Sequence, residues 1–322
     1  MKTKKDQLGF WGGLSRPFFV LAPMADVTDP PFRRIIAKYG KPDVMYTQFV
    51  SADGLCSPGR RVLLRDLSYG EGEHPIVAQL FGARPEKMRE AARLVSELGF
   101  DGIDINMGCP DRNVEKQGAG AALIKNPNLA KELIYAVRVG APGLPISIKT
   151  RIGYRANDLA LWLPALLETK PAAIIIHART RQEMSKVPAH WETITEAVTL
   201  ARGSGTFIIG NGDVTDIADA RAKVAATGCD GIMFGRAIFG NPWFFNEIER
   251  PSLEVRLRVM LEHTAAFEEM LGDVKPFPMM KKHFKSYLGS FPGARDLRLE
   301  LMECNNTQEV KQSVEDFLSK IR

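Results

Sequence analysis

Cysteine is scarce in this sequence. The 322 residues contain four cysteines, Cys56, Cys109, Cys229 and Cys304, and no two of them form a Cys-x-x-Cys pair. Structural zinc sites need closely spaced ligands, and small secreted domains need a dense disulfide framework. The sequence therefore argues against both, and a reduced, cytoplasmic setting is expected.

Long apolar runs, low-complexity segments and short repeats are also absent. The apolar patch at residues 8–14 is short and interrupted by glycine, so we expect no signal peptide and no membrane span. Charge of one sign is only slightly in excess, with a formal net charge of +5. This mildly basic balance suits a polyanionic partner without establishing one. A hydrophobic share of 45% and a charged share of 25% are typical of a globular protein.

What the sequence does contain is a regular alternation of short apolar runs and helical segments. Strands are predicted at residues 18–22, 44–47, 76–80, 102–106, 146–149, 173–177, 207–210 and 231–234. Helices are predicted at residues 32–39, 85–98, 128–139, 158–168, 191–201 and 216–226. The strands are apolar along nearly their whole length, as parallel strands covered on both faces require. Eight such units in about 240 residues favour an α/β fold, a (β/α)8 TIM barrel, over a doubly wound open sheet.

The alternation stops after Trp243. Residues 253–271, 278–288 and 308–321 are predicted helices, separated by breaks at 272–273, 291–293 and 305–306. We therefore expect two domains. A TIM barrel would cover residues 1–246, and a small all-helical C-terminal domain would cover residues 247–322.

Polar residues and glycines gather where the predicted strands end. These positions are Pro23, Met24, Gln79, Asn106, Cys109, Lys149, His177, Asn211, Gly212, Asp213, Gly235 and Arg236. Because the carboxyl ends of barrel strands converge, we expect one active site there. The ends of strands seven and eight, at residues 210–213 and 235–236, lie where barrels commonly bind phosphate. No acidic pair accompanies His177 at metal-ligand spacing, so a metal site is not expected.

The segment 104–110, Asp-Ile-Asn-Met-Gly-Cys-Pro, is the centre of this group. A buried strand ends at Asn106, and Gly108 and Pro110 prevent a helix from following at once. Cys109 then precedes a long loop, which favours an active-site thiol over a buried structural cysteine in a turn.

Two side chains of the group keep several interpretations open. Lys149 could form a Schiff base, could hold negative charge on a bound cofactor, or could be a surface lysine with a buried stem. His177 could be an acid, a donor to a cofactor ring or a metal ligand, or it could be a structural histidine.

A series of motifs gives the sequence a family resemblance. Residues 22–29, 79–82 and 104–110, followed by 118–123, resemble the motifs of the tRNA-dihydrouridine synthases. The series continues in order with residues 149–153, 177–181, 210–213 and 235–237, and residues 279–289 resemble the family's helical-domain motif. The resemblance covers essentially the whole chain and is closest to the bacterial B-type branch. One segment departs from it, since residues 182–190 lack the tyrosine and the Gly-x-Ala-x-Trp run that usually follow His-x-Arg-Thr-Arg.

The resemblance implies an enzyme that reduces uridines in tRNA to dihydrouridine, with FMN as cofactor and NADPH or NADH as reductant. Five residues would surround the flavin ring, namely Pro23, Met24, Gln79, Lys149 and His177. Five would hold ribityl and phosphate, namely Asn211, Gly212, Asp213, Gly235 and Arg236. Asn106 would face the target uracil, and Cys109 would be the general acid. Further substrate contacts are expected from Arg151, Arg179, Arg181, Lys281, Lys282 and Lys285. The protein is expected to act as a monomer without a membrane partner.

The residue types suit this chemistry. Reduction of the uracil C5–C6 bond adds a hydride at C6, which the flavin supplies, and a proton at C5. A thiol with its ordinary pKa of about 8.5 is mostly protonated at neutral pH and can donate that proton. Lys149 and His177 would stabilise negative charge on the reduced flavin. The uracil must also leave the RNA stack, at a cost on the order of a few kcal/mol.

The predicted helical domain carries a cluster of cations. Between residues 273 and 298, Lys275, Lys281, Lys282, Lys285, Arg295 and Arg298 are opposed only by Asp273 and Asp296. With Phe284 and Tyr287 beside it, the cluster is predicted to bind RNA phosphates. A solvated face and a dimerisation cap are the alternatives.

Two other functions stay open. A flavin-dependent barrel enzyme that acts on a small molecule, such as a dihydroorotate or enoate oxidoreductase, would share the phosphate site but would not need the basic helices. A non-catalytic RNA-binding protein on a barrel scaffold is the other, and the intact set of Cys109, Lys149 and His177 argues against it.

Overall fold

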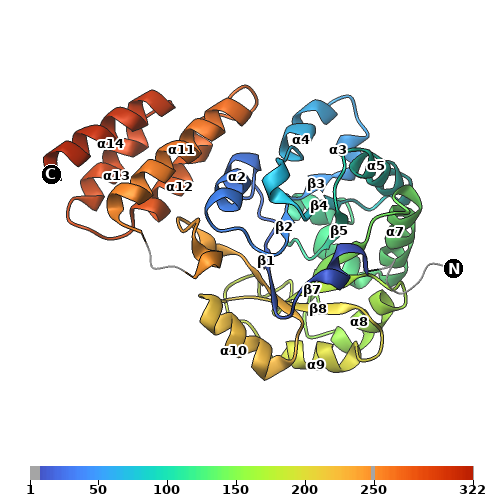
Figure 1. Ribbon diagram of the computed structural model, residues 1–322. Coiled ribbons are helices and arrows are strands. Elements are labelled where there is room, and N and C mark those ends of the chain that lie inside the picture. The colour runs from blue at the N-terminus through green and yellow to red at the C-terminus, as the bar shows by residue number, and fades with distance from the viewer. Residues whose placement is uncertain (1–7, 248–250, 322) are drawn as a thin grey trace.

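Nine parallel-paired strands form the centre of the molecule in the computed structural model, which describes residues 8–247 and 251–321 (Figure 1). They are β1 (Phe18–Leu21), β2 (Met45–Tyr46), β3 (Val50–Ser51), β4 (Ile76–Phe81), β5 (Gly102–Met107), β6 (Ile146–Arg151), β7 (Ala173–His177), β8 (Phe207–Asn211) and β9 (Gly231–Phe234). The strand order is β1-β9-β8-β7-β6-β5-β4-β2, with β3 beside β4. A parallel bridge between Val20 and Val44 joins β1 to the start of β2, so the ring is nearly closed. The predicted (β/α)8 barrel is confirmed.

Helices cover the outside of the ring. The longer ones are α2 (Pro30–Tyr39), α5 (Pro85–Glu97), α7 (Pro127–Gly140), α8 (Leu159–Leu167), α9 (Glu192–Leu200) and α10 (Ile217–Thr227). Local sequence explains their starts. The side chains of Asp29, Asn126 and Asp216 cap α2, α7 and α10, and a proline occupies the first turn of α2, α5 and α7. Three short helices, α3 (Ala52–Leu55), α4 (Arg60–Asp66) and α6 (Arg112–Lys116), were not predicted because four to seven residues show no helical periodicity.

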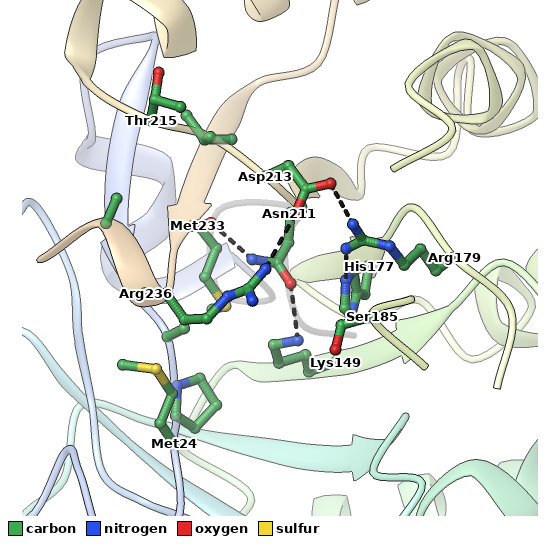
Figure 2. A pocket seen from close by; sticks show the side chains of 16 residues that line it. Met24, Lys149, His177, Arg179, Ser185, Asn211, Asp213, Thr215, Met233 and Arg236 are labelled. Atoms are coloured by element: carbon green, nitrogen blue, oxygen red, sulfur yellow. Dashed lines mark hydrogen bonds and ion pairs between the residues drawn. The ribbon is translucent and has the colours of Figure 1, made fainter. Parts of the chain in front are cut away.

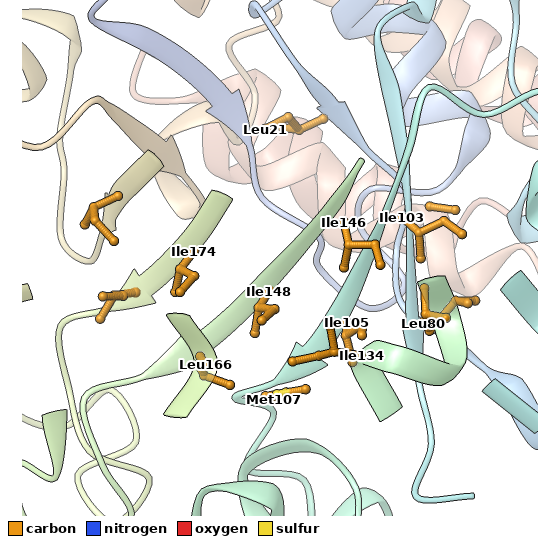
Figure 3. Packing of buried hydrophobic residues seen from close by; sticks show 14 of the residues in the cluster. Leu21, Leu80, Ile103, Ile105, Met107, Ile134, Ile146, Ile148, Leu166 and Ile174 are labelled. Atoms are coloured by element: carbon orange, nitrogen blue, oxygen red, sulfur yellow. The ribbon is translucent and has the colours of Figure 1, made fainter. Parts of the chain in front are cut away.

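Each barrel strand separates two packed layers. On β5 and β6 the residues Ile103, Ile105, Met107, Ile146 and Ile148 point outward and pack in the shell with helix residues such as Ile134 and Leu166 (Figure 3). The alternate residues point into the barrel. There Val20, Tyr46, Val77, Ile175 and Ile209 form a second cluster, which Trp11 and Phe18 join. Since side chains alternate along a strand, inward-facing polar residues near the strand ends line the barrel mouth.

The C-terminal part is a group of four helices in the described residues, α11 (Leu253–Leu271), α12 (Pro278–Leu288), α13 (Ala294–Glu303) and α14 (Thr307–Ile321). The sequence predicted three, and the missing one was α13. It buries only Leu297 and Leu301 and exposes Leu299 and Met302, so its apolar pattern is weak. None of the helices in the described ranges combines the length and apolar character needed to cross a membrane.

The helical part packs on the barrel through α2 (Figure 1). The Phe32 ring lies against His263 of α11 and His283 of α12, with centroid distances of 5.7 and 5.5 Å. Glu262 accepts hydrogen bonds from Lys38 Nζ and Tyr39 Oη, both at 2.6 Å. The predicted domain boundary at 246/247 adjoins residues 248–250, which lie outside the described part, and that division stays a prediction.

Candidate active site

Two adjoining cavities open at the carboxyl ends of the barrel strands. The larger has a volume of about 660 Å³ and the smaller about 190 Å³. Pro23, Met24, Lys149 and His177 line both, so these four residues form the wall between them. The larger cavity is also lined by the predicted residues Asn211, Gly212, Asp213, Gly235 and Arg236 (Figure 2). The smaller is lined by Gln79, Asn106, Cys109 and Arg151. The predicted strand-end residues therefore meet at one place.

The ends of β8 and β9 leave open space in the larger cavity. Gly212 has a φ of +135°, a backbone conformation that favours glycine, and a Cβ there would lie 2.8 Å from Ala189 Cβ. At Gly235 a Cβ would project toward the cavity, where it would meet only Met24 Sδ at 3.8 Å. The wall at Gly235 is thus bare backbone, which a bound group can approach closely.

Asp213 joins two arginines at this end of the cavity. Its carboxylate pairs with Arg179 and, at 3.2 Å, with Arg236 Nη2 (Figure 2). Arg179 is buried, with its Nε donating to Val187 O at 2.6 Å, whereas the Arg236 side chain is 69% exposed. Arg179, a predicted substrate contact, lines the larger cavity, where Asp213 and His177 contact its guanidinium.

Lys149 lies on β6 in the wall that the two cavities share. Its Nζ donates to Asn211 Oδ1 at 3.2 Å, and Asn211 Nδ2 donates to Met233 O at 2.8 Å. Burial lowers the pKa of Lys149 to about 8, and the nearby Arg151 charge acts in the same direction. The ammonium is therefore a cation that a bound anion would stabilise.

His177 at the end of β7 is held as a neutral imidazole. Burial moves its pKa well below the usual value, and the charges of Lys149 and Arg151 add to the effect. Its Nε2 lies 3.0 Å from Arg179 Nη1. Because a guanidinium can only donate, Nε2 must accept, and the ring proton is then on Nδ1. His177 can thus donate one hydrogen bond from Nδ1.

The Cys109 thiol is partly exposed on the loop after β5. Its backbone is fixed on both sides, since Cys109 N donates to Asn106 Oδ1 at 2.9 Å and Cys109 O accepts from Ala121 N at 2.9 Å. Gly120, with a φ of +61°, permits this close approach, because a Cβ there would lie 2.7 Å from Cys109 O. Burial raises the pKa of the thiol above its ordinary value, so it stays protonated at neutral pH.

Arg151 and Arg181 tie the loop after β5 to the loop after β7. Arg151 Nε donates to Gly108 O at 2.8 Å, and its Nη1 donates to Thr180 O and Met184 O at 3.0 and 2.9 Å. Arg181 forms an ion pair with Glu115. Within the atypical segment 182–190, His190 Nε2 lies 2.9 Å from Glu183 Oε1, so this segment is internally bonded.

The six cations of the 273–298 cluster fall into two groups. Lys275 pairs with Asp66 at 2.8 Å, Lys281 Nζ donates to Met302 O at 2.5 Å, and Lys282 Nζ donates to Asp26 O. The second group, Lys285, Arg295 and Arg298, surrounds a surface hollow of about 490 Å³ and has no carboxylate partner among the described residues. The aromatic residues expected beside them, Phe284 and Tyr287, are 0% and 1% exposed in the helical core, so that expectation was wrong.

Sequence reasoning missed several residues of the site. Ser185 and Thr215 line the larger cavity and Phe49 the smaller, all from loops without a motif. Asp104 and Ser147 lie fully buried beneath the cavities. Both are polar residues at inward-facing positions of apolar strands, which was a usable signal. In the described ranges no three His, Cys, Asp or Glu side chains are grouped to hold a metal ion.

Solved structures similar to this one define the class of fold. A morphinone reductase mutant in complex with tetrahydroNAD aligns with a TM-score of 0.51 and 16% identity, covering 74% of this chain and 87% of that one. Histamine dehydrogenase from Rhizobium sp. 4-9 aligns with a TM-score of 0.55 and 13% identity, covering 82% of this chain and 51% of that one. At such identities the likeness shows the shared fold alone, a parallel barrel surrounded by helices.

Sequence comparison identifies the family. The model of the dihydrouridine synthase (Dus) family matches residues 20–322. A probable tRNA-dihydrouridine synthase 2 of Bacillus subtilis (strain 168) is 42% identical over 317 residues, which is 97% of both chains. A probable tRNA-dihydrouridine synthase of Staphylococcus aureus (strain Mu50) is 40% identical over 315 residues, 96% of this chain and 95% of that one. The chain belongs to the dihydrouridine synthase family of enzymes.

Proposed function

We propose that this protein is an FMN-dependent tRNA-dihydrouridine synthase that reduces the C5–C6 bond of uridines in tRNA at the expense of NADPH or NADH. Cys109 is the general acid. The protein acts in the cytoplasm as a monomer. Family membership and the names of the relatives support the reaction.

The observation that carries the proposal is the shared wall of the two cavities. Lys149 and His177 border both cavities. The 660 Å³ cavity is also lined by two arginines, and the 190 Å³ cavity is lined by Cys109. A planar cofactor in the first and a base at the second would therefore meet at these two side chains. That is the arrangement that transfer between a cofactor and a flipped base needs.

The larger cavity fits FMN. Arg179 and Arg236 are opposed on its lining by Asp213 alone, which leaves an excess of positive charge for a phosphate. Gly235 offers bare backbone beside the exposed Arg236 guanidinium. A bare turn with an adjacent arginine after the last two strands is how barrels commonly bind phosphate. Pro23 and Met24 supply apolar surface for the ring.

Bound FMN would supply the hydride after reduction by the nicotinamide. The chain's own residues prepare the site for that chemistry. Lys149 brings a buried positive charge and His177 an Nδ1–H donor to the place where negative charge develops. The Cys109 thiol, protonated because burial raises its pKa, donates the proton that C5 requires.

The three arginines of the mouth have separate roles in this scheme. Arg179 belongs to the cofactor cavity, since it is buried against His177 and Asp213. Arg151 and Arg181 hold the loops that shape the base-binding cavity, through Gly108 O and Glu115. Only a minor part of Arg181, whose side chain is 24% exposed, is available to RNA.

The RNA backbone is bound by the hollow of Lys285, Arg295 and Arg298. Helix α12, which carries Lys285, is joined to the barrel mouth, because Lys282 Nζ donates to Asp26 O close to the cavity residue Met24. A strand of phosphates on this face would thus lead to the site. Lys281 and Lys282 support the face through their carbonyl contacts and contribute less binding.

The test is product formation by the purified, flavin-loaded protein. Transcribed tRNA without modifications is incubated with NADPH, digested, and searched for dihydrouridine by mass spectrometry. We expect dihydrouridine at a defined position, absent when NADPH is omitted. A protein that oxidises NADPH only with small enoates or orotate, and leaves tRNA unchanged, would instead be a small-molecule reductase.

A further inference from the structure

A chain of buried polar side chains runs up the inside of the barrel to the Cys109 loop. Gln79, Asp104 and Ser147 face one another across β4, β5 and β6, where they are register partners. Asp104 Oδ1 accepts from Ser147 Oγ at 2.6 Å, and Asp104 Oδ2 accepts from Gln79 Nε2 at 2.7 Å. All three side chains are at most 1% exposed, so water does not reach these bonds.

The chain continues to the active-site loop through Asn106. Asn106 Nδ2 donates to Gln79 Oε1 at 3.0 Å. Asn106 Oδ1 accepts from the backbone N–H groups of Gly108 and Cys109, at 3.1 and 2.9 Å. Both ends of the Asn106 amide are therefore engaged within the protein. The Asn106 side-chain oxygen is thus bonded directly to the backbone that carries the Cys109 thiol.

The Asp104 carboxylate determines which end of each amide donates in this chain of hydrogen bonds. An amide has one donating and one accepting end, whereas an ionised carboxylate only accepts. Asp104 therefore obliges Gln79 to turn its amino group downward, which leaves Gln79 Oε1 facing Asn106. Asn106 must in turn point its amino group down and its oxygen up, under the two loop N–H groups. A neutral amide at position 104 would allow the reverse orientation, which points Asn106 donors at loop donors.

We propose that Asp104 is a positioning residue, whose carboxylate orients Gln79 and Asn106 and thereby fixes the backbone and the thiol of Cys109. This inference rests on the proposed function for the role of Cys109, whereas the chain of bonds stands by itself. Asp104 touches neither cavity and acts through Asn106.

An ionised carboxylate at position 104 is not needed for the stability of the folded protein. Burial raises the pKa of Asp104 from 3.8 to about 7, with Ser147 and Gln79 partly offsetting the effect. A folded pKa above the unfolded one means that the folded state binds the proton more tightly. The contribution of Asp104 to stability therefore decreases as the pH rises from about 4 to about 7. An asparagine of the same shape would avoid this cost but would lose the fixed direction.

The experiment measures the reactivity of each cysteine in the full-length, flavin-loaded protein at pH 8.5, without tRNA. Iodoacetamide labelling is followed by peptide mass spectrometry in the parent and in Asp104→Asn. We expect Cys109 to be alkylated several-fold faster in the variant, because its loop is released. The rate at Cys56, the other partly exposed thiol, should not change. Tyr46→Phe is the matched control, because Tyr46 Oη contacts Ser147 Oγ at 2.9 Å and so joins the network through Ser147 without a bond to Gln79 or Asn106.

A second variant separates positioning from general loosening. Asn106→Ala cuts the same chain at its upper end and leaves Asp104 with both donors, so it should release Cys109 even if Asp104→Asn does not fold. When Asp104→Asn and Asn106→Ala are combined, the alkylation rate of Cys109 should be no higher than in Asn106→Ala alone. Additive increases, an unchanged Cys109 rate in Asp104→Asn, or equal acceleration of Cys56 would each overturn the inference. Since labelling needs no tRNA, this outcome is independent of whether the parent forms dihydrouridine.

Discussion

The barrel mouth and the helical part use their charged side chains in opposite ways. At the mouth, Lys149, Arg151 and Arg179 are largely buried and each has protein partners. In the helical part, Lys285, Arg295 and Arg298 surround an open hollow without carboxylate partners in the described ranges. Buried, oriented charges set the protonation and geometry of a reaction, whereas exposed cations attract a polyanion over a distance. The predictions below separate these two uses.

The largest effect is expected at Cys109. Cys109→Ala should lower the rate of dihydrouridine formation by about 10²–10⁴-fold, the usual share of a positioned acid. FMN content and NADPH oxidation should stay near the parental values, because Cys109 lines the smaller cavity and is not part of the buried core. Cys109→Ser should also be poor, since a hydroxyl is a weaker acid. Cys56→Ala is the control for losing a partly exposed thiol. If Cys109 is structural, the variants will instead lose stability or flavin and retain activity per folded molecule.

The phosphate end of the larger cavity comes next. Arg236→Ala removes a charge-assisted contact and should weaken FMN binding by about 1.5–3 kcal/mol, or roughly 10–150-fold. Release of FMN, followed by its fluorescence, measures the affinity. Arg221→Ala is a suitable control, because Arg221 is similarly exposed but pairs with Glu247. Unchanged FMN affinity in Arg236→Ala would remove the phosphate assignment.

The third prediction concerns the salt dependence of tRNA binding to the helical part. Replacing Lys285, Arg295 and Arg298 together by Ala should weaken tRNA binding and flatten the log–log salt slope by about two to three, at roughly 0.7–0.9 per phosphate contact. Flavin reduction by NADPH should stay normal. A charge-matched triple variant of Arg258, Lys311 and Lys320 removes three other cations of the helical part, which lie on α11 and α14. Equal slopes for the two triple variants would mean that the hollow is only a solvated face.

The smallest effect is a pH dependence at Lys149. Because burial lowers its pKa to about 8, the flavin-free protein loses this cation as the pH rises from 7 to 9. FMN affinity should decrease a few-fold over that range, as expected for an anion that loses a nearby charge. Lys149→Arg should keep a constant affinity, since arginine stays protonated. FMN titrations of the parent and of Lys149→Arg at each pH give the two affinities. The same pH dependence of affinity in both proteins would contradict the role of Lys149.

The barrel could be predicted from sequence because its signals are local. The apolar runs recur eight times, and several of them end at polar residues. Because side chains alternate along a strand, Gln79, Asn106, Lys149, His177 and Asn211 all face inward and meet at one mouth. The short helices α3, α4 and α6 carry too few turns to show a period. α13 was missed because only two of its residues are buried.

The roles of single side chains were harder to predict because they depend on partners distant in sequence. Arg179 and Arg181 are two residues apart, yet one is buried on Asp213 and the other pairs with Glu115. On α12, neighbouring lysines differ in the same way, since Lys282 reaches Asp26 while Lys285 faces the hollow. The motifs identify these arginines and lysines as residues of the site. Their individual roles depend on the tertiary contacts that each side chain makes.

The central claim is that Cys109 delivers the proton at a site that receives the hydride separately, and stopped-flow spectroscopy tests it most directly. The parent and Cys109→Ala are reduced with one equivalent of NADPH under anaerobic conditions and then mixed with unmodified tRNA. Both should be reduced at the same rate, and only the parent should be rapidly reoxidised by tRNA. Reoxidation of Cys109→Ala at the parental rate would contradict the account.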